Sequence, residues 1–217
     1  MTDRPLVAVV DYGIGNLHSA HKALERMGAD ARLTADPGLI GAADGVVLPG
    51  VGAFGACMAA LRTARLEQPI LASVASGRPF LGICVGMQML FSASEESPGA
   101  RGLGVIAGTV QWIPTSEKLP QMQWNQLAIR HGDDPLLAGI GARPWMYFLH
   151  SLHGVPDDAA TVAATCQYGT TVNAAFRQGN VSAVQFHPEK SSHSGLTLLG
   201  NFVRVSAGVA AAASSKN

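Results

Sequence analysis

The stretch Pro79-Phe80-Leu81-Gly82-Ile83-Cys84-Val85-Gly86-Met87-Gln88 changes from an apolar, strand-like run to a helix-like run at a single cysteine. Glycine stands two residues before and two residues after Cys84, in the pattern G-x-C-x-G. A sharp strand-to-helix turn crowds its neighbours, and glycine removes the Cβ atoms that would clash there. The stretch therefore predicts a nucleophile elbow, with the Cys84 thiol held clear of the edge of a sheet.

The start of a helix at Val85 would also favour the reactive form of this cysteine. Free backbone N–H groups and the positive end of the helix dipole would point at the sulfur and stabilise the thiolate. The alternative is that Cys84 is one more small apolar residue of the core, which is common for intracellular cysteines. The elbow alone does not decide between the two.

A second motif lies near the C-terminus, in Ala183-Val184-Gln185-Phe186-His187-Pro188-Glu189. Residues two apart on a strand point to one face, so His187 and Glu189 are expected side by side, and Pro188 is expected to end the strand. A histidine base needs one ring nitrogen free for a nucleophile and the other held by an orienting group. Singly, these residues could be a strand-end histidine and a solvated acid. With Cys84 they predict a Cys-His-Glu triad.

Composition favours one compact domain and excludes several classes of protein. The 217 residues are 47% hydrophobic and 14% charged, enough to bury a full core. Fifteen basic residues balance fifteen acidic ones, so we expect no nucleic-acid partner and no membrane partner. Three widely spaced cysteines predict neither a disulfide framework nor a metal site. The chain has no secretory h-region near Met1 and no membrane-length apolar run, and we predict a cytoplasmic protein.

The order of elements predicts an α/β fold. We expect a single domain over residues 1–207, with a mixed, mostly parallel central sheet, helices on both faces and a more antiparallel C-terminal half. Strands and helices alternate up to Cys84, whereas the second half consists mainly of short strands linked by turns. Residues 92–104 are expected to form a mobile surface loop, and residues 208–217 a disordered tail.

Two glycine-rich stretches bear on cofactors. Gly13-Ile14-Gly15 follows a strand, but His18 stands where a dinucleotide fingerprint needs its third glycine, and no phosphate-binding P-loop pattern occurs. We therefore expect no cofactor. Pro49-Gly50-Val51-Gly52 could form a backbone-lined floor for an oxyanion, or an ordinary turn between strand and helix.

These motifs together resemble the class I glutamine amidotransferase family, whose triad is Cys, His and Glu in this chain order. Further stretches are similar to the glutaminase subunits of imidazole glycerol phosphate synthases, and the resemblance runs from about residue 6 to residue 205. They are Asp11-Tyr12-Gly13-Ile14-Gly15-Asn16-Leu17, Leu48-Pro49-Gly50-Val51-Gly52-Ala53-Phe54, Trp124-Asn125 and Tyr147-Phe148-Leu149-His150-Ser151.

The resemblance implies a role for each matching residue. Cys84 would attack the side-chain amide of glutamine, His187 would carry protons and Glu189 would orient His187. The N–H groups of Val51 and Val85 would form the oxyanion hole. The residues implied to contact glutamine are Gly50, Gly52, Gln88 and Ser151.

The resemblance also implies a partner. Ammonia released from glutamine would pass to a (β/α)₈-barrel cyclase bound as a heterodimer, through a face that includes Asn16, Trp124, Asn125 and Tyr147. One stretch departs from the family. Where Pro-His-Met-Gly-Trp-Asn is expected, this chain has Pro120-Gln121-Met122-Gln123-Trp124-Asn125, so Gln121 and Gln123 depart from the family pattern beside the expected partner face.

Two other functions remain open on the sequence. One is a class I glutaminase serving another synthase, for example in anthranilate, guanylate or pyridoxal phosphate synthesis. The other is a non-catalytic binding module that keeps the same scaffold, because a fold does not determine a function.

Overall fold

A mixed β-sheet forms the centre of the computed structural model, which describes residues 4–15, 17–130 and 132–214. Within these residues the sheet has eight strands, in the order β2-β1-β3-β4-β13-β12-β11-β8. The first five strands run parallel, and the last three join through antiparallel pairs. Their bounds are β2 Asp30–Thr34, β1 Leu6–Val10, β3 Gly45–Gly50, β4 Phe80–Cys84, β13 Val181–Val184, β12 Thr171–Gln178, β11 Val162–Gln167 and β8 Ala128–Ile129.

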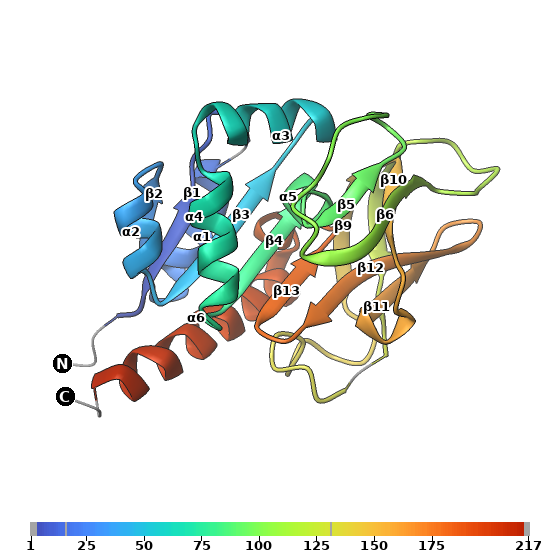
Figure 1. Ribbon diagram of the computed structural model, residues 1–217. Helices are drawn as coiled ribbons and strands as arrows, with labels where there is room; N and C mark the ends of the chain where they lie inside the picture. The colour runs from blue at the N-terminus through green and yellow to red at the C-terminus, as the bar shows by residue number, and fades with distance from the viewer. Residues whose placement is uncertain (1–3, 16, 131, 215–217) are drawn as a thin grey trace.

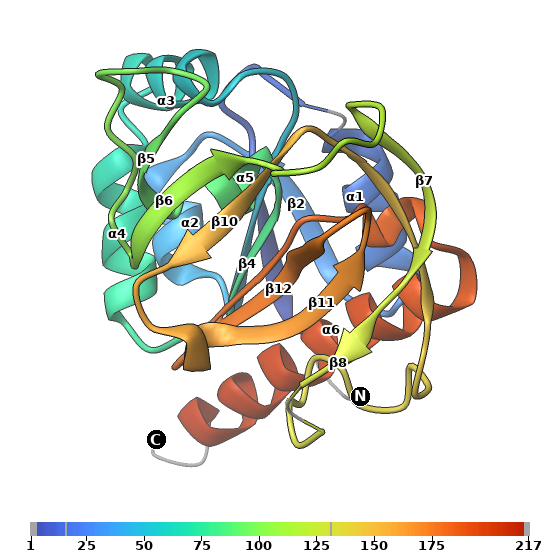
Figure 2. The same cartoon turned by 90° about the vertical axis from the view of Figure 1, so that its right-hand side faces the viewer.

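Burial explains why the parallel strands are continuous apolar runs. Every residue of β3 and β4 is buried, as expected for central strands covered on both faces, whereas edge strand β2 mixes buried and exposed residues. Helices cover both faces (Figures 1 and 2). One layer contains α1 (Leu17–Arg26) and α6 (Ser192–Ser214), and the other contains α2 (Pro37–Ala42), α3 (Phe54–Thr63) and α4 (Glu67–Ala75).

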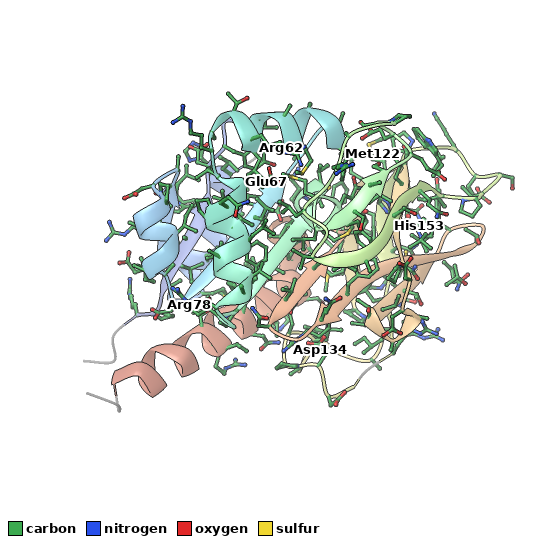
Figure 3. The ribbon with its side chains drawn as sticks, in the orientation of Figure 1. Arg62, Glu67, Arg78, Met122, Asp134 and His153 are labelled. Atoms are coloured by element: carbon green, nitrogen blue, oxygen red, sulfur yellow. The ribbon has the colours of Figure 1, made fainter. Side chains whose placement is uncertain are left out.

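Charged side chains join the elements of the second helical layer (Figure 3). The Arg62 guanidinium contacts the Glu67 carboxylate at 2.8 Å and so links α3 to the start of α4. Arg78 donates to the carbonyl oxygens of Gly41 and Ala43 at the end of α2. The first contact joins the two helices between β3 and β4, and the second ties the segment before β4 to the end of α2, just before β3.

Two smaller sheets lie beside the antiparallel half. One is ordered β10-β6-β5, from Leu152–Pro156, Ile106–Trp112 and Phe91–Ser94. The other pairs β7 (Gln121–Gln126) with β9 (Trp145–His150). Short helical turns complete the chain: α5 (Val85–Gln88), η1 (Ala159–Thr161) and η2 (Pro188–Lys190).

The predicted fold class is confirmed, with differences in detail. The segment 92–104, expected to be a loop, begins inside β5, because Phe91 and Ser94 are buried against neighbouring strands. Helix α6 continues through residues 208–214, where a disordered tail was expected; this segment is rich in alanine, which has the highest helix propensity. Residues 215–217 lie outside the described residues, and the domain boundary at residue 207 stays a prediction. No described helix is both long enough and apolar enough to cross a bilayer.

Candidate active site

The predicted elbow is present at the junction of β4 and α5. Cys84 ends the strand with φ 55° and ψ −117°, a left-handed backbone conformation that a residue other than glycine adopts only when its surroundings enforce it. A Cβ atom on Gly86 would lie 1.9 Å from the Leu48 carbonyl oxygen, and one on Gly82 would lie 2.9 Å from the Met87 Cα. Both glycines are therefore required by close approach, as the pattern predicts. Because α5 has only four residues, its dipole can add little at the sulfur.

His187 and Glu189 meet, though not by the strand geometry that the sequence suggested. Strand β13 ends at Val184, three residues before His187, and Pro188–Lys190 form a 3₁₀ turn that Pro188 starts. The turn brings the His187 Nδ1 to 2.8 Å from the Glu189 Oε1. Both side chains are at least 95% buried. The prediction of one strand through His187 is wrong, but the predicted pair forms.

The electrostatics of this pair favour the protonated ring. Burial lowers the pKa of His187, but hydrogen bonds and charge interactions with Cys84 and Glu189 outweigh it and raise the pKa to about 10. Since Nδ1 faces Glu189, Nε2 is the ring nitrogen left to serve Cys84. An imidazolium beside a cysteine sulfur is the arrangement that activates thiolate nucleophiles in enzymes.

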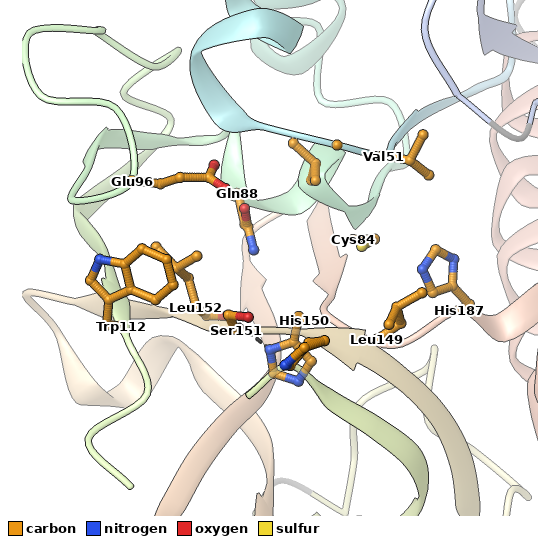
Figure 4. A pocket seen from close by; sticks show the side chains of 13 residues that line it. Val51, Cys84, Gln88, Glu96, Trp112, Leu149, His150, Ser151, Leu152 and His187 are labelled. Atoms are coloured by element: carbon orange, nitrogen blue, oxygen red, sulfur yellow. Dashed lines mark hydrogen bonds between the residues drawn. The ribbon is translucent and has the colours of Figure 1, made fainter. Parts of the chain in front are cut away.

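A cavity of about 260 Å³ opens in front of Cys84 and His187 (Figure 4). It lies at the carboxyl ends of β3, β4 and β13, where open α/β sheets bind their ligands. The predicted residues Val51, Gly52, Cys84, Val85, Gln88, Ser151 and His187 line it. Gly50 pairs with Cys84 in the register of β3 and β4, and it lines a small cavity of about 10 Å³ together with His187 and Glu189.

Two side chains hold the glycine-rich turn at residues 49–52 by hydrogen bonds to its carbonyl oxygens. The Tyr12 hydroxyl donates to the Pro49 carbonyl oxygen at 2.9 Å, and the Cys57 thiol donates to the Val51 carbonyl oxygen at 3.2 Å. Burial raises the pKa values of Tyr12 and Cys57, so both groups stay protonated and remain donors. A Cβ atom on Gly50 would lie 2.6 Å from the Gly86 nitrogen, so a larger residue there would push the turn away from the elbow.

Sequence reasoning missed two groups of the site. Gln185 is fully buried and its amide nitrogen lies 3.8 Å from the Cys84 sulfur. Glu96 lines the cavity, and its Oε2 accepts the Phe54 backbone N–H at 2.7 Å. The position of Gln185 two residues before His187 in the motif was a signal that could have identified it. Glu96 lies in the segment expected to be a loop, and no local pattern marks it.

The residues predicted to meet a partner lie on the β7–β9 pair, apart from Asn16, which falls outside the described residues. Trp124 and Tyr147 are cross-strand partners with ring centroids 6.1 Å apart in an edge-to-face contact. The Asn125 amide donates to the Gln167 carbonyl oxygen at 2.8 Å. Their contact with a partner stays a prediction.

The two departures from the family pattern lie on this same strand but in different surroundings. Gln123 is exposed, whereas Gln121 is fully buried. The Gln121 amide nitrogen lies 3.8 Å from the Cys166 sulfur, and its Oε1 has no hydrogen-bond partner. Gln121 therefore belongs to the interior beneath the strand rather than to its outer face.

No group of three or more His, Cys, Asp or Glu side chains in the described ranges could hold a metal ion. The three cysteines are unpaired and buried. The cavity lining includes a thiol, an imidazole and an amide, groups that can act by nucleophilic attack, proton transfer and hydrogen bonding.

A second buried histidine lines the cavity and gives a prediction for stability. Burial lowers the pKa of His150 to about 4, although its Nδ1 contacts the Leu152 carbonyl oxygen at 2.7 Å. Because an unfolded histidine titrates near 6.5, the unfolded state gains a proton first as pH falls, and folding loses stability between about pH 6.5 and pH 4. The loss should approach ~3 kcal/mol.

Urea unfolding at several pH values tests this. The wild-type chain should lose more unfolding free energy on acidification than His150→Gln, whose side chain does not titrate. Parallel curves for the two proteins would show that His150 is not the group responsible.

The fold and the cysteine, histidine and glutamate at its edge define a class of enzyme. A sequence model described as Glutamine amidotransferase class-I matches residues 8–205, and the chain belongs to this family. Two solved structures share the fold. A putative GMP synthase subunit from Thermoplasma acidophilum has a TM-score of 0.74 at 22% identity and covers 99% of this chain and 100% of its own. PurLQS from Thermotoga maritima has a TM-score of 0.72 at 20% identity and covers 93% and 99%.

Curated relatives at about 50% identity are subunits of one kind of synthase. The chain is 52% identical over 206 residues to the imidazole glycerol phosphate synthase subunit HisH of Synechococcus elongatus, covering 94% of each chain. It is 50% identical to the HisH subunit of Methylococcus capsulatus, covering 91% of this chain and 95% of the relative. It is 48% identical to that of Methanothermobacter thermautotrophicus, covering 92% and 98%.

Proposed function

We propose that this protein is the glutaminase subunit of an imidazole glycerol phosphate synthase, in histidine biosynthesis. It hydrolyses glutamine to glutamate and ammonia and supplies the ammonia to a cyclase subunit. The observation that carries the proposal is the buried His187–Glu189 pair, 2.8 Å apart, in one cavity with an elbow cysteine. Relatives named as HisH subunits of imidazole glycerol phosphate synthase match more than nine-tenths of the chain.

The first half of the reaction forms a thioester. The Cys84 thiol gives its proton to the His187 Nε2, and its sulfur attacks the side-chain amide carbon of glutamine. The backbone N–H groups of Val51 and Val85 stabilise the oxyanion of the tetrahedral intermediate. The carbon–nitrogen bond then breaks as His187 returns the proton to the leaving nitrogen, which departs as ammonia.

The second half of the reaction releases glutamate. A water molecule gives a proton to the His187 Nε2 and attacks the thioester carbon, and the same oxyanion hole stabilises the second intermediate. The carbon–sulfur bond breaks and Cys84 recovers the proton from His187. Through both halves Glu189 fixes the ring, because its Oε1 occupies the Nδ1 side of the imidazole.

The far end of the cavity suits the charged end of glutamine. Gln88 and Ser151 line the cavity and offer polar groups to the substrate there. Glu96 adds a carboxylate that can pair with the α-ammonium group of the substrate (Figure 4). The backbone N–H of Phe54 holds the other side of that carboxylate, so its orientation is set before glutamine binds.

Ammonia must reach a partner directly, since at neutral pH free ammonia becomes unreactive ammonium. We propose that the receiving cyclase is a (β/α)₈-barrel that binds this chain as a heterodimer. The outer face of the β7–β9 pair supports such a contact, because it exposes large apolar side chains that a lone chain leaves to solvent. These are Met122 (Figure 3), Trp124, Trp145 and Leu149.

The chemistry expected needs neither cofactor nor metal. The cytoplasmic location predicted from the sequence stays a prediction. A glutaminase for another synthase is less well supported, because the GMP synthase protein is only 22% identical, against 48–52% for the HisH subunits. A non-catalytic module is less well supported, because it would not need a buried His187–Glu189 pair in one cavity with Cys84.

Glutamate release from glutamine by the purified chain tests the proposal, with and without a cyclase subunit loaded with a substrate analogue. We expect slow release by the chain alone and a steep rise with the loaded cyclase, because the family resemblance implies that the turn at residues 49–52 completes the oxyanion hole only when the partner binds. No release in either condition, despite a stable complex, would contradict glutaminase chemistry. High release without the partner would contradict the dependence on the cyclase.

A further inference from the structure

Two buried glutamine side chains connect the substrate cavity to the Cys84 sulfur. Gln185 follows β13, where its backbone N–H donates to the Ala174 carbonyl oxygen at 2.9 Å. Its side chain has no exposed surface. The Gln88 amide nitrogen donates to the Gln185 Oε1 at 3.0 Å, and the Gln185 Nε2 lies 3.8 Å from the Cys84 Sγ. The chain of contacts therefore runs from Gln88 through Gln185 to the nucleophile.

The hydrogen bonds determine which end of the Gln185 amide faces the sulfur. A primary amide has one acceptor oxygen and one donor nitrogen. Because the oxygen already accepts from Gln88, the nitrogen must point to Cys84. Gln88 in turn lies on α5, one turn after the elbow, and lines the cavity. Gln88 thus holds Gln185 in the orientation that presents an N–H group to the sulfur.

An N–H donor at this position interacts more strongly with the thiolate form of Cys84 than with the thiol form. A thiol is a weak acceptor, whereas a thiolate accepts a strong, charge-assisted hydrogen bond. Burying an amide is costly unless its groups find partners, and the Gln185 donor is better satisfied when the sulfur is charged. The contact therefore favours the thiolate.

Other groups near the sulfur do not replace this donor. The titratable groups around Cys84 are His187, with Glu189 behind it, Tyr12 beneath the glycine-rich turn, Cys57 on α3, and Glu96 and His150 in the lining of the cavity. Burial lowers the pKa of His150 to about 4 and so keeps its ring neutral. Of these, His187 supplies the positive charge. Burial keeps Tyr12 and Cys57 protonated, and their donors are directed to the Pro49 and Val51 carbonyl oxygens.

We infer that Gln185 donates a hydrogen bond to the Cys84 sulfur and is a further catalytic residue of this site, with Gln88 aligning its amide. The inference rests on the proposed function, in which the sulfur carries negative charge twice. It is charged before it attacks glutamine, and it is charged again as the leaving group when water cleaves the thioester. Gln185 stabilises the sulfur at both points.

The test is the pH dependence of alkylation of Cys84 by iodoacetamide, measured on the full chain, with the labelled residue identified by mass spectrometry. Gln185→Met keeps an unbranched side chain and removes the N–H donor. The midpoint of its pH–rate profile should move up by about one to two pH units relative to the wild-type chain, the range typical of a hydrogen bond to a charged group. An unchanged midpoint would overturn the inference.

A matched control is available in the same chain. Gln121 is also fully buried, and its amide nitrogen lies 3.8 Å from a different sulfur, that of Cys166. Gln121→Met should leave the Cys84 midpoint where it is in the wild-type chain. If it moved the midpoint as far as Gln185→Met does, the shift would come from altered packing, and the inference would fail.

A second variant decides the case if Gln185→Met does not fold. Gln88→Met leaves Gln185 in place but removes the bond that orients it, and should shift the midpoint in the same direction by a smaller amount. No shift would overturn the inference. Alkylation needs neither glutamine nor a partner, so this result is independent of whether the chain proves to be a glutaminase.

Discussion

Complexes that carry Cys84→Ala are expected to lose glutamine-dependent turnover and to keep the cyclase reaction with added ammonium salts. In the proposed mechanism Cys84 supplies the sulfur that forms the thioester, and neither His187 nor the oxyanion hole can supply that bond. Removal of a catalytic nucleophile typically reduces turnover on the order of a millionfold. Ammonium salts bypass this step, because ammonia then reaches the cyclase without glutamine hydrolysis.

Two rates measured on one preparation make the test specific. Glutamate formation should be undetectable, while the ammonia-dependent rate should match that of the wild-type complex. Cys166→Ala is a suitable control, since it also removes a buried thiol but lies on β11, outside the lining of the cavity. Equal loss of both activities in the Cys84 variant would indicate damage to folding or assembly and would contradict the role assigned to this residue.

The elbow could be predicted from sequence because its determinants are local. Two glycines and one cysteine within five residues are enough to specify a turn that larger side chains would block, and the close approaches at Gly82 and Gly86 follow from that turn. The parallel half of the sheet was predictable for a similar reason. Fully buried strands such as β3 and β4 must be apolar along their whole length, and the sequence shows this directly.

Contacts between distant segments could not be predicted in the same way. Gln88 and Gln185 are 97 residues apart, and their hydrogen bond depends on how β13 lies beside β4. The burial of Gln121 likewise follows from the pairing of β7 with β9, which puts Gln121 opposite His150 on the inner face. A polar residue in a short strand gives no local sign of which face it will occupy.

The geometry of His187 and Glu189 shows a second limit of prediction from sequence. Spacing by two residues suggested neighbours on a strand, whereas the chain leaves the sheet at Val184 and makes a 3₁₀ turn. Pro188 was read as the end of a strand, but it also starts a turn well. Both backbones bring residues two apart together, so the chemistry was predictable while the local structure was not.

His187→Ala is expected to reduce glutamine-dependent turnover far more than Glu189→Gln. Without the imidazole, no group accepts the Cys84 proton or returns it to the leaving ammonia, and a loss on the order of a millionfold is expected, as for other triad bases. Glu189→Gln keeps the base and can still accept the Nδ1–H at its amide oxygen, so a loss of about ten-thousandfold or less is expected.

The pH dependence of turnover in Glu189→Gln shows whether Glu189 acts on His187 or only contributes to packing. In the wild-type chain Cys84 and Glu189 raise the pKa of His187 to about 10 against the effect of burial. Removing the Glu189 charge must lower that pKa, because less negative charge then stabilises the imidazolium. Since protonated His187 is the acid that releases ammonia in the proposed mechanism, the alkaline limb of the turnover profile should move to lower pH in Glu189→Gln. Turnover equal to wild type would mean that Glu189 does not orient His187. An alkaline limb that does not move would mean that the charge of Glu189 does not raise the pKa of His187.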